Sequence, residues 1–528
     1  MYPRPLLLFS GCALATTTPR GRTRSSPPSS PHRTFSSLIS QIADAAPPHY
    51  ARADPAAFRA WLAAAASSLD PDALLAQLAA FTDGATTRCA LVPLVYLAHA
   101  FRWGATRPPQ WVMDEGDAAP ALPHPLGAAL HALRAPLGLQ ASGSISLLFL
   151  WNWGLVGGGG GRAAGPRLPA PGEPFDPATH LATATVRPRF RFCSGELEGA
   201  EAAVLHSVLL TEAAGTGMGR ALVRLFEAAA DAEDAAREDG VALKTAAAAG
   251  AAGRAAAAAW RWLPWSPARR AVRAAASAAA AAADRHAALK QCLGVFHTVF
   301  RQASIPISAW AFHIQPSLCA VAPGDHGVGG AQMPWVHASD AAFGIDQAGD
   351  ALGAVVAANA GCLLPEERLF VSFCAAHGVP LRRWLRGKGA RAAVVAQAPA
   401  ADPFPGLAPL PDLAAPARDA FASALAALVA WRATHRARAA AYLAPPGAPV
   451  RATTGGTAVY GGGGDDGDDN AAAASVRVRA GFNALMDGRI TSTRRAGLKS
   501  GGPGVGVVAM PATTAATASP AMAELFPE

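Results

Sequence analysis

The sequence is short of cysteine, of aromatic residues and of long apolar runs, and two of these shortages exclude whole classes of protein. Its 528 residues contain seven cysteines, which are far apart and form neither a CxxC pair nor a Cys/His ligand spacing. We therefore expect no zinc site. The longest useful apolar run, SISLLFLW at 144–151, is far shorter than the roughly 20 residues that cross a bilayer. We expect no membrane-spanning segment.

Acidic residues are absent from the first 43 residues, which contain five arginines: Arg4, Arg20, Arg22, Arg24 and Arg33. The formal net charge of the whole chain is +8, so the remainder carries only +3 once these five are subtracted. This positive charge is too small, for a chain of this length, to indicate a nucleic-acid-binding surface. We expect no nucleic-acid partner.

The composition of residues 1–45 indicates a targeting sequence. This stretch is rich in Arg, Ser and Thr, which is typical of a transit peptide for a mitochondrion or a chloroplast. A secretory signal is an alternative, because PLLLFSGCALA at 5–15 has an apolar core and a small-residue end. A disordered tail is the third interpretation. Without a transit peptide we expect a cytoplasmic protein.

Few segments alternate apolar and polar residues with a period of two, the pattern of a half-buried strand. This argues against a β-rich domain and predicts an all-α fold. We expect a small, mostly helical N-terminal domain at 46–155 and a large helical domain at 156–445. A flexible tail at 446–528 should contain one helix at about 479–498. Within the large domain, helical patterns occur at 198–230, 285–302, 336–358, 365–377 and 416–443.

Local signals mark the breaks between these segments. A helical pair at 55–81 is interrupted by Asp70 and Pro71, which suit the N-cap and first turn of the second helix. A glycine run at 154–166 predicts a linker, because it lacks the Lys-Ser/Thr of a phosphate-binding loop. The alanine-rich stretch at about 231–283 predicts an insertion that packs outside the large domain or is partly disordered.

One histidine falls on the apolar face of the helix predicted at 416–443. At 3.6 residues per turn, a single stripe contains Phe421, Leu425, Leu428, Arg432, His435, Ala439 and Tyr442. A neutral core histidine bonded to a carbonyl is one interpretation of His435. The other is a proximal haem ligand, with Arg432 bonding a haem propionate. The second explains why an arginine, which is costly to bury alone, lies on this face.

Several segments between about residues 90 and 498 resemble, in the same order, segments of the indoleamine 2,3-dioxygenase family. They are LAHAFRWG (97–104), LWNW (150–153), FRFCSGE (190–196), LKQCLGVFH (289–297), SDAAFGI (339–345), LLPEERLFV (363–371), LRGKG (385–389), LVAWRATHRARAAAYLAPP (428–446), TTGGT (453–457) and NALMDGRITSTRRAGL (483–498). Members of this family are monomeric haem enzymes that open the indole ring of tryptophan.

The resemblance implies a large helical haem-binding domain, haem b as the iron cofactor, and tryptophan or an indoleamine plus O2 as substrates. The product would be of the N-formylkynurenine type, as in tryptophan catabolism by the kynurenine pathway. By position, His435 matches the axial iron ligand and Arg432 the arginine that helps hold a propionate. Asp340 matches the aspartate near that arginine. We expect a monomer and no catalytic acid or base among the side chains, because the cofactor carries this chemistry.

The segment expected on the distal side of the haem, PISAWAFHIQPSLCA at 306–320, departs from the family pattern. Trp310 falls near the position of an aromatic pair. Gln315, or Ile314 in an ungapped alignment, falls where the family has an arginine that pairs with the substrate carboxylate. Glutamine carries no charge, so the carboxylate of tryptophan would lose its ionic partner.

A second distal loop is shortened to GGAQMP at 329–334, and the serine of the family's loop is missing. Gly330 and Ala331 are the residues of this loop that we expect beside the substrate, together with Trp310 and Gln315. The departures leave an alternative open: a haem-binding protein with lost or altered tryptophan activity, either a sensor or an enzyme for another indole.

Overall fold

The computed structural model describes residues 39–46, 55–79, 84–103, 122–140, 143–155, 186–260, 263–299, 304–321, 325–386, 412–443 and 471–499. Most of them are helical, so the predicted all-α class is confirmed. The strands found in these ranges, β1 (Trp153–Leu155) and β2 (Val186–Pro188), form one short antiparallel pair with Trp153 opposite Pro188. No helix in these ranges is long and apolar enough to cross a membrane.

The predicted targeting segment falls largely outside the described residues. Its last residues, however, belong to a helix at 39–46 in which Ile39, Ala43 and Ala46 are buried in the core. A removable segment would therefore end before Ile39, several residues earlier than the boundary expected from composition. The glycine run also falls outside the described residues from residue 156 onward.

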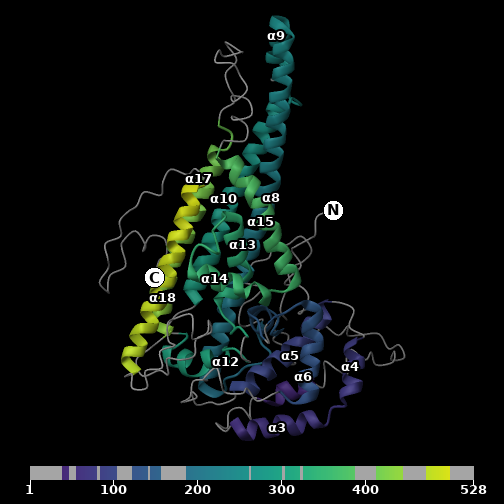
Figure 1. Ribbon diagram of the computed structural model, residues 1–528, viewed down its shortest axis with the longest axis vertical. Helices are drawn as coiled ribbons and strands as arrows, with labels where there is room; N and C mark the ends of the chain where they lie inside the picture. The colour runs from purple at the N-terminus through teal and green to yellow at the C-terminus, as the bar shows by residue number, and fades with distance from the viewer. Residues whose placement is uncertain are drawn as a thin grey trace, which may run out of the picture.

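The N-terminal helices form the lower part of the molecule in Figure 1. They are α3 (Pro55–Ser67), α4 (Pro71–Ala79), α5 (Gly84–Trp103) and α6 (His124–Arg134), followed by the 3₁₀ turn η1 (Ala135–Leu137). The predicted cap at the start of α4 is confirmed: Asp70 Oδ1 accepts the backbone N–H groups of Asp72 and Ala73 at 3.0 and 3.2 Å.

Two long helices and the short helix between them form a tower that projects from the top of the molecule in Figure 1. They are α8 (Glu198–Ala248), α9 (Gly250–Trp260) and α10 (Pro267–Val299). The alanine-rich stretch predicted as an outer insertion is, where described, the end of α8, all of α9 and the start of α10. Its buried alanines are Ala232, Ala235, Ala257, Ala268, Ala271, Ala275, Ala278, Ala281 and Ala282. Small side chains let neighbouring helices such as α8 and α10 approach closely.

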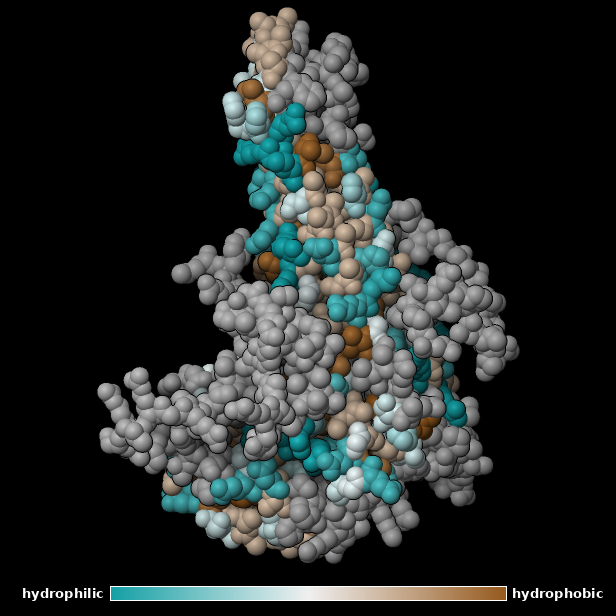
Figure 2. All heavy atoms as spheres, turned by 180° about the vertical axis from the view of Figure 1, so that it is seen from behind, coloured by the Kyte–Doolittle hydropathy of each residue, from teal (hydrophilic) through white to brown (hydrophobic). Residues whose placement is uncertain are grey.

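The outer surface of the tower is mixed in character. Figure 2 shows hydrophilic and hydrophobic residues interspersed along it, without one continuous apolar face on the side in view. Exposed large apolar residues do occur there, among them Val241, Trp265 and Val272. Scattered apolar residues of this kind are normal on protein surfaces and carry no functional argument alone.

The remaining elements surround the base of the tower. They are η2 (Ser146–Leu150), η3 (Gly195–Leu197), α11 (Ile307–Ala309), η4 (Trp310–Ile314), α12 (Gln315–Ser317), η5 (Gly330–Gln332), α13 (Pro334–Phe343), α14 (Ala351–Ala358), η6 (Asn359–Cys362), α15 (Pro365–Leu385), α17 (Ala415–Leu443) and α18 (Ala471–Lys499). Helix α17 packs on α10 and also on α18, so it lies between the tower and the C-terminal helix.

The helix predicted at 336–358 is broken in two. Helix α13 ends at Phe343, and Gly344 adopts a left-handed conformation with φ of +67°. A Cβ at Gly344 would also lie 2.5 Å from the guanidinium carbon of Arg382, so that side chain would have to move, and the left-handed conformation is the main reason for glycine here.

Stability is expected to depend on pH through His99, a fully buried residue of α5. Its Nδ1 lies 2.9 Å from the carbonyl oxygen of Ser317, and burial lowers its pKa from 6.5 to about 4. The folded state thus favours the neutral imidazole. The contribution of His99 to the free energy of unfolding is fully present above pH 6.5. It is lost as the pH falls toward 4, and the loss is about 3 kcal/mol at most. His99→Asn keeps an N–H donor but does not titrate.

Urea unfolding at a series of pH values measures this effect. Burial raises the pKa of Glu367 from 4.5 to about 7, so this glutamate makes the folded state more stable as the pH falls through that range, opposite to His99. Glu367 is present in both proteins, so the difference in stability between variant and wild type at each pH reports on His99 alone. We expect the wild type to lose more stability than His99→Asn on acidification from pH 6.5 to 4. His131→Asn, on the exposed side of α6, is the control. Parallel curves for wild type and His99→Asn would show that the pKa of His99 is the same in the folded and unfolded states, and would contradict the expected shift.

Candidate functional site

The stripe predicted on α17 is buried over most of its length. Phe421, Leu425, Leu428, Arg432 and Tyr442 are all buried, and His435 and Ala439 are half-buried. Tyr442 donates its hydroxyl to the carbonyl of Ile305 at 3.0 Å, which fixes the C-terminal end of the helix. The periodicity therefore identified the inward face of α17 correctly.

Arg432 and Asp340, which the resemblance places near each other, are in direct contact. Arg432 Nη2 lies 2.5 Å from Asp340 Oδ1, and the two side chains are 4% and 0% exposed. The second carboxylate oxygen of Asp340 bonds Arg489 of α18. One buried carboxylate is thus shared by two guanidinium groups from different helices, and the pairing is far stronger than a surface ion pair.

Arg489, Thr493 and Asp350 complete this network and were not identified from the sequence. Arg432 Nη1 bonds the hydroxyl of Thr493, which itself donates to the Arg489 carbonyl at 2.7 Å. Arg489 Nη1 lies 3.1 Å from Asp350 Oδ2. A signal was available, because Arg489 and Thr493 are four residues apart on one face of a predicted helix, next to the apolar Met486 and Ile490.

The two arginines respond differently to their surroundings. Burial lowers the pKa of Arg432, and Asp340 only partly opposes this. Burial acts in the same sense on Arg489, but Asp340 and Asp350 together hold the pKa of Arg489 above its ordinary value. Both terminal nitrogens of Arg432 bond protein groups, so in this structure the side chain ties α17 to α13 and α18. Its role toward a propionate stays a prediction.

His435 lies one turn beyond Arg432 in an aromatic environment. Its ring stacks on Trp431 with centroids 5.1 Å apart and planes 11° apart, and Phe296 meets it edge-on at 5.5 Å. Burial lowers the pKa of His435 to about 4, so the imidazole is neutral at physiological pH. His297 lies nearby, since His435 is among the groups that act on its pKa. A neutral imidazole is the form that binds a metal.

The surroundings of His435 contain buried polar groups that could bond a cofactor. Trp431 packs against Trp335 with centroids 5.1 Å apart, and the indole N–H groups of both are buried without a partner in the described part of the chain. Unpartnered buried donors are uncommon and point to a missing acceptor. An apolar aromatic setting, a neutral imidazole and the buried N–H of Trp431 are the features that would suit haem b, which stays a prediction. The N–H of Trp335 lies on the side of the separate cavity described below.

The four predicted distal residues are found in two places. Trp310 begins η4, a π-helical turn that contacts both α8 and α17, and Gln315 follows directly in α12. Single π-helical turns often occur at functional sites. Gly330 and Ala331 lie in η5, where the Ala331 carbonyl is 2.8 Å from His337 Nε2. Trp310 thus belongs to a turn that approaches the helix of His435, whereas Gln315 lies in α12, which packs on α5 and η4. Gly330 and Ala331 are held to the start of α13.

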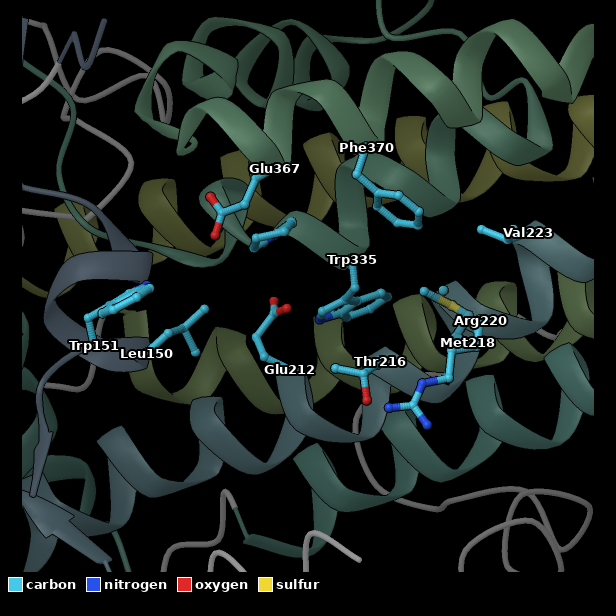
Figure 3. Close-up of a pocket in the computed structure, with 13 residues that line it drawn as sticks. Leu150, Trp151, Glu212, Thr216, Met218, Arg220, Val223, Trp335, Glu367 and Phe370 are labelled. Carbon is cyan, nitrogen blue, oxygen red and sulfur yellow. The ribbon is translucent and has the colours of Figure 1, made fainter. Parts of the chain in front are cut away.

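A separate cavity of about 90 Å³ lies between α8, α13 and α15 and is shown in Figure 3. Trp335 lines it and also packs on Trp431, so one indole lies between this cavity and the aromatic residues around His435. None of the predicted site residues lines the cavity.

Comparison with known proteins adds no relative. The chain matches no family model and no curated protein sequence. The likeness to indoleamine 2,3-dioxygenases therefore rests on the short segments quoted above.

Proposed function

We propose that this protein is a haem-dependent dioxygenase that opens the indole ring of tryptophan or of a related indoleamine. The observation that supports it best is the position of His435. This neutral imidazole lies in an aromatic environment one turn from the buried Arg432–Asp340 pair. These are the three positions that the family resemblance assigns to the axial ligand, its arginine and its aspartate.

The residues of this chain would have distinct tasks. Bound haem b would supply the reaction with O2, which the side chains cannot perform. His435 would bind the iron, and burial keeps its imidazole free of a competing proton. Trp431 restricts the ring to one orientation by stacking on it. The Arg432–Asp340 pair fixes the rotation of α17, so it is a positioning element behind the ligand.

A second candidate function is favoured by Gln315. This residue is 3% exposed and neutral, at the position where the family resemblance leads us to expect a substrate-binding arginine. A tryptophan carboxylate brought to this residue would lose its hydration without gaining an ionic partner. An indole amine without a carboxylate would meet no such penalty. The alternative is therefore a haem protein whose substrate, or sensed ligand, is not the amino acid.

Gln315→Arg is expected to raise kcat/KM for L-tryptophan about ten- to a hundredfold, the worth of one charge-assisted hydrogen bond. Tryptamine should gain little, because it has no carboxylate. The assay reduces the haem-loaded protein with ascorbate and a mediator and follows the absorbance of N-formyl products. Gln315→Leu is the matched control and should not improve tryptophan.

Wild-type protein that turns over L-tryptophan with a micromolar KM and rejects tryptamine would contradict this assignment of Gln315. The partner of the substrate carboxylate would then be another group, such as Arg301, which lies outside the described residues. Haem-loaded protein that oxidises neither compound would favour the sensor.

We also propose that the sequence before Ile39 directs the protein to an organelle, since the buried helix at 39–46 begins after it.

A further inference from the structure

The cavity between α8, α13 and α15 contains two acidic side chains that the proposed function does not use. Glu212 comes from α8 and Glu367 from α15, and both are more than nine-tenths buried. Figure 3 shows their carboxyl groups at the same end of the hollow, beside Leu150 and Trp151. Burial of two carboxyl groups in one small cavity is costly unless something compensates their charge.

Both carboxylate oxygens of Glu367 accept hydrogen bonds, whereas one oxygen of Glu212 does not. The Glu367 carboxylate accepts the Ser146 hydroxyl at 2.8 Å and the Leu364 backbone N–H at 2.7 Å. Glu212 accepts the backbone N–H of Trp335, but its Oε1 is buried and has no partner in the described part of the chain. An unpartnered acceptor that faces a cavity indicates a missing donor.

The charge of Glu367 also acts on Glu212. Burial and the charge of Glu367 raise the pKa of Glu212 well above its ordinary value, and burial raises the pKa of Glu367 to about 7. A positive group between them would favour both ionised forms. Arg88 pairs with Glu366 and lies over the Trp151 ring, and its charge lowers the pKa of Glu367 only in part. Figure 3 shows Arg220 at the opposite end of the cavity.

The remaining walls identify the kind of cation. Trp151, Trp335 and Phe370 present aromatic surface, which stabilises ammonium groups. A hard metal ion would require six or more oxygen ligands, or several bound waters, and aromatic walls supply none. The volume, about 90 Å³, is smaller than the roughly 150 Å³ apolar cavity that holds benzene. The ligand must therefore have few carbon atoms.

We propose that this cavity binds a small primary alkylammonium ion, which donates N–H groups to Glu212 and Glu367 and packs its carbon chain against Trp335. This site does not depend on haem or on His435. The inference therefore stands or falls separately from the proposed function.

Ethylammonium chloride is the probe, and ethanol is its neutral counterpart of similar size. Saturation-transfer NMR on the full-length protein should detect ethylammonium, with calorimetry giving its affinity, and should not detect ethanol. Glu212→Gln should weaken binding at least tenfold. Glu227→Gln, on the exposed side of the same helix, should leave it unchanged. The His435→Ala variant should bind ethylammonium as the wild type does.

A second variant keeps both carboxyl groups and changes only the size of the cavity. Leu150→Ala removes part of the wall beside them and should shift the preference from ethylammonium toward butylammonium. Equal binding of ethanol and ethylammonium, equal competition by sodium ions, or unchanged affinity in Glu212→Gln would each overturn the proposal. Unchanged selectivity between the two amines in Leu150→Ala would place the bound amine elsewhere and overturn it too.

Discussion

Asp340→Asn is expected to lower the free energy of unfolding by about 3–5 kcal/mol, because it breaks a buried ion pair and leaves charge uncompensated. Asp340 is fully buried and bonds two guanidinium groups, those of Arg432 and Arg489. The amide of asparagine can accept one hydrogen bond from either arginine, but it carries no charge. Urea unfolding of the full chain, followed by circular dichroism, measures the loss.

The matched control is Asp284→Asn. Asp284 pairs with Arg224 at 2.9 Å, but both side chains are more than half exposed. Breaking such a surface pair should change stability by about 1 kcal/mol or less. Equal losses in Asp340→Asn and Asp284→Asn would contradict the description of Asp340 as the charge that holds α13, α17 and α18 together.

A double-mutant cycle tests the direct coupling of Asp340 to Arg432. Arg432→Met removes one guanidinium and replaces the side chain with a shorter, unbranched apolar one. The double variant Asp340→Asn, Arg432→Met should lose less stability than the sum of the two single losses, because it leaves only Arg489 uncompensated by Asp340. Strict additivity would show that Arg432 and Asp340 do not interact in solution.

Much of the fold could be predicted because its signals are local. The helical spacing of Leu425, Leu428 and Arg432 predicted which face of α17 points inward, and all three side chains are buried in the structure. The start of α4 followed from Asp70, whose carboxylate bonds the N–H groups of its own first turn. Such features involve neighbours within four residues, so the sequence alone contains them.

The partners within the buried network could not be predicted from local patterns. Arg489 and Asp340 are 149 residues apart, and nothing near either residue indicates which charge it meets. The resemblance supplied only the Arg432–Asp340 pair. The cavity carboxyls, Glu212 and Glu367, come from two helices and face each other only because α8 and α15 pack together.

The alanine-rich stretch is part of the tower that projects from the molecule in Figure 1, but its composition did not indicate that its alanines would be buried there. Alanine buries little area, so the stretch at 231–283 indicated an outer insertion or partial disorder. In the structure, small side chains such as Ala275 and Ala278 are buried in the tower of α8 and α10. Close approach of helices can thus compensate for the absence of large apolar residues.

His435→Ala should remove the axial ligand, and with it the cofactor. We expect haem affinity to fall by more than the ~10–100-fold that removal of an outer-shell partner costs, because His435 is itself the proposed ligand. Its neighbours support this expectation: Trp431 and Phe296 flank the imidazole, and burial keeps it neutral. His131→Ala, which changes an exposed histidine of α6, is the control for the substitution.

The most direct measurement is a titration of the purified protein with haemin, read at the Soret band with the wild type, His435→Ala and His131→Ala. We expect one haem per chain and the spectrum of a histidine-ligated haem for the wild type and His131→Ala. For His435→Ala we expect no Soret band, or loosely held haem without that spectrum. Unchanged haem content and an unchanged ligand spectrum in His435→Ala would contradict the assignment of His435.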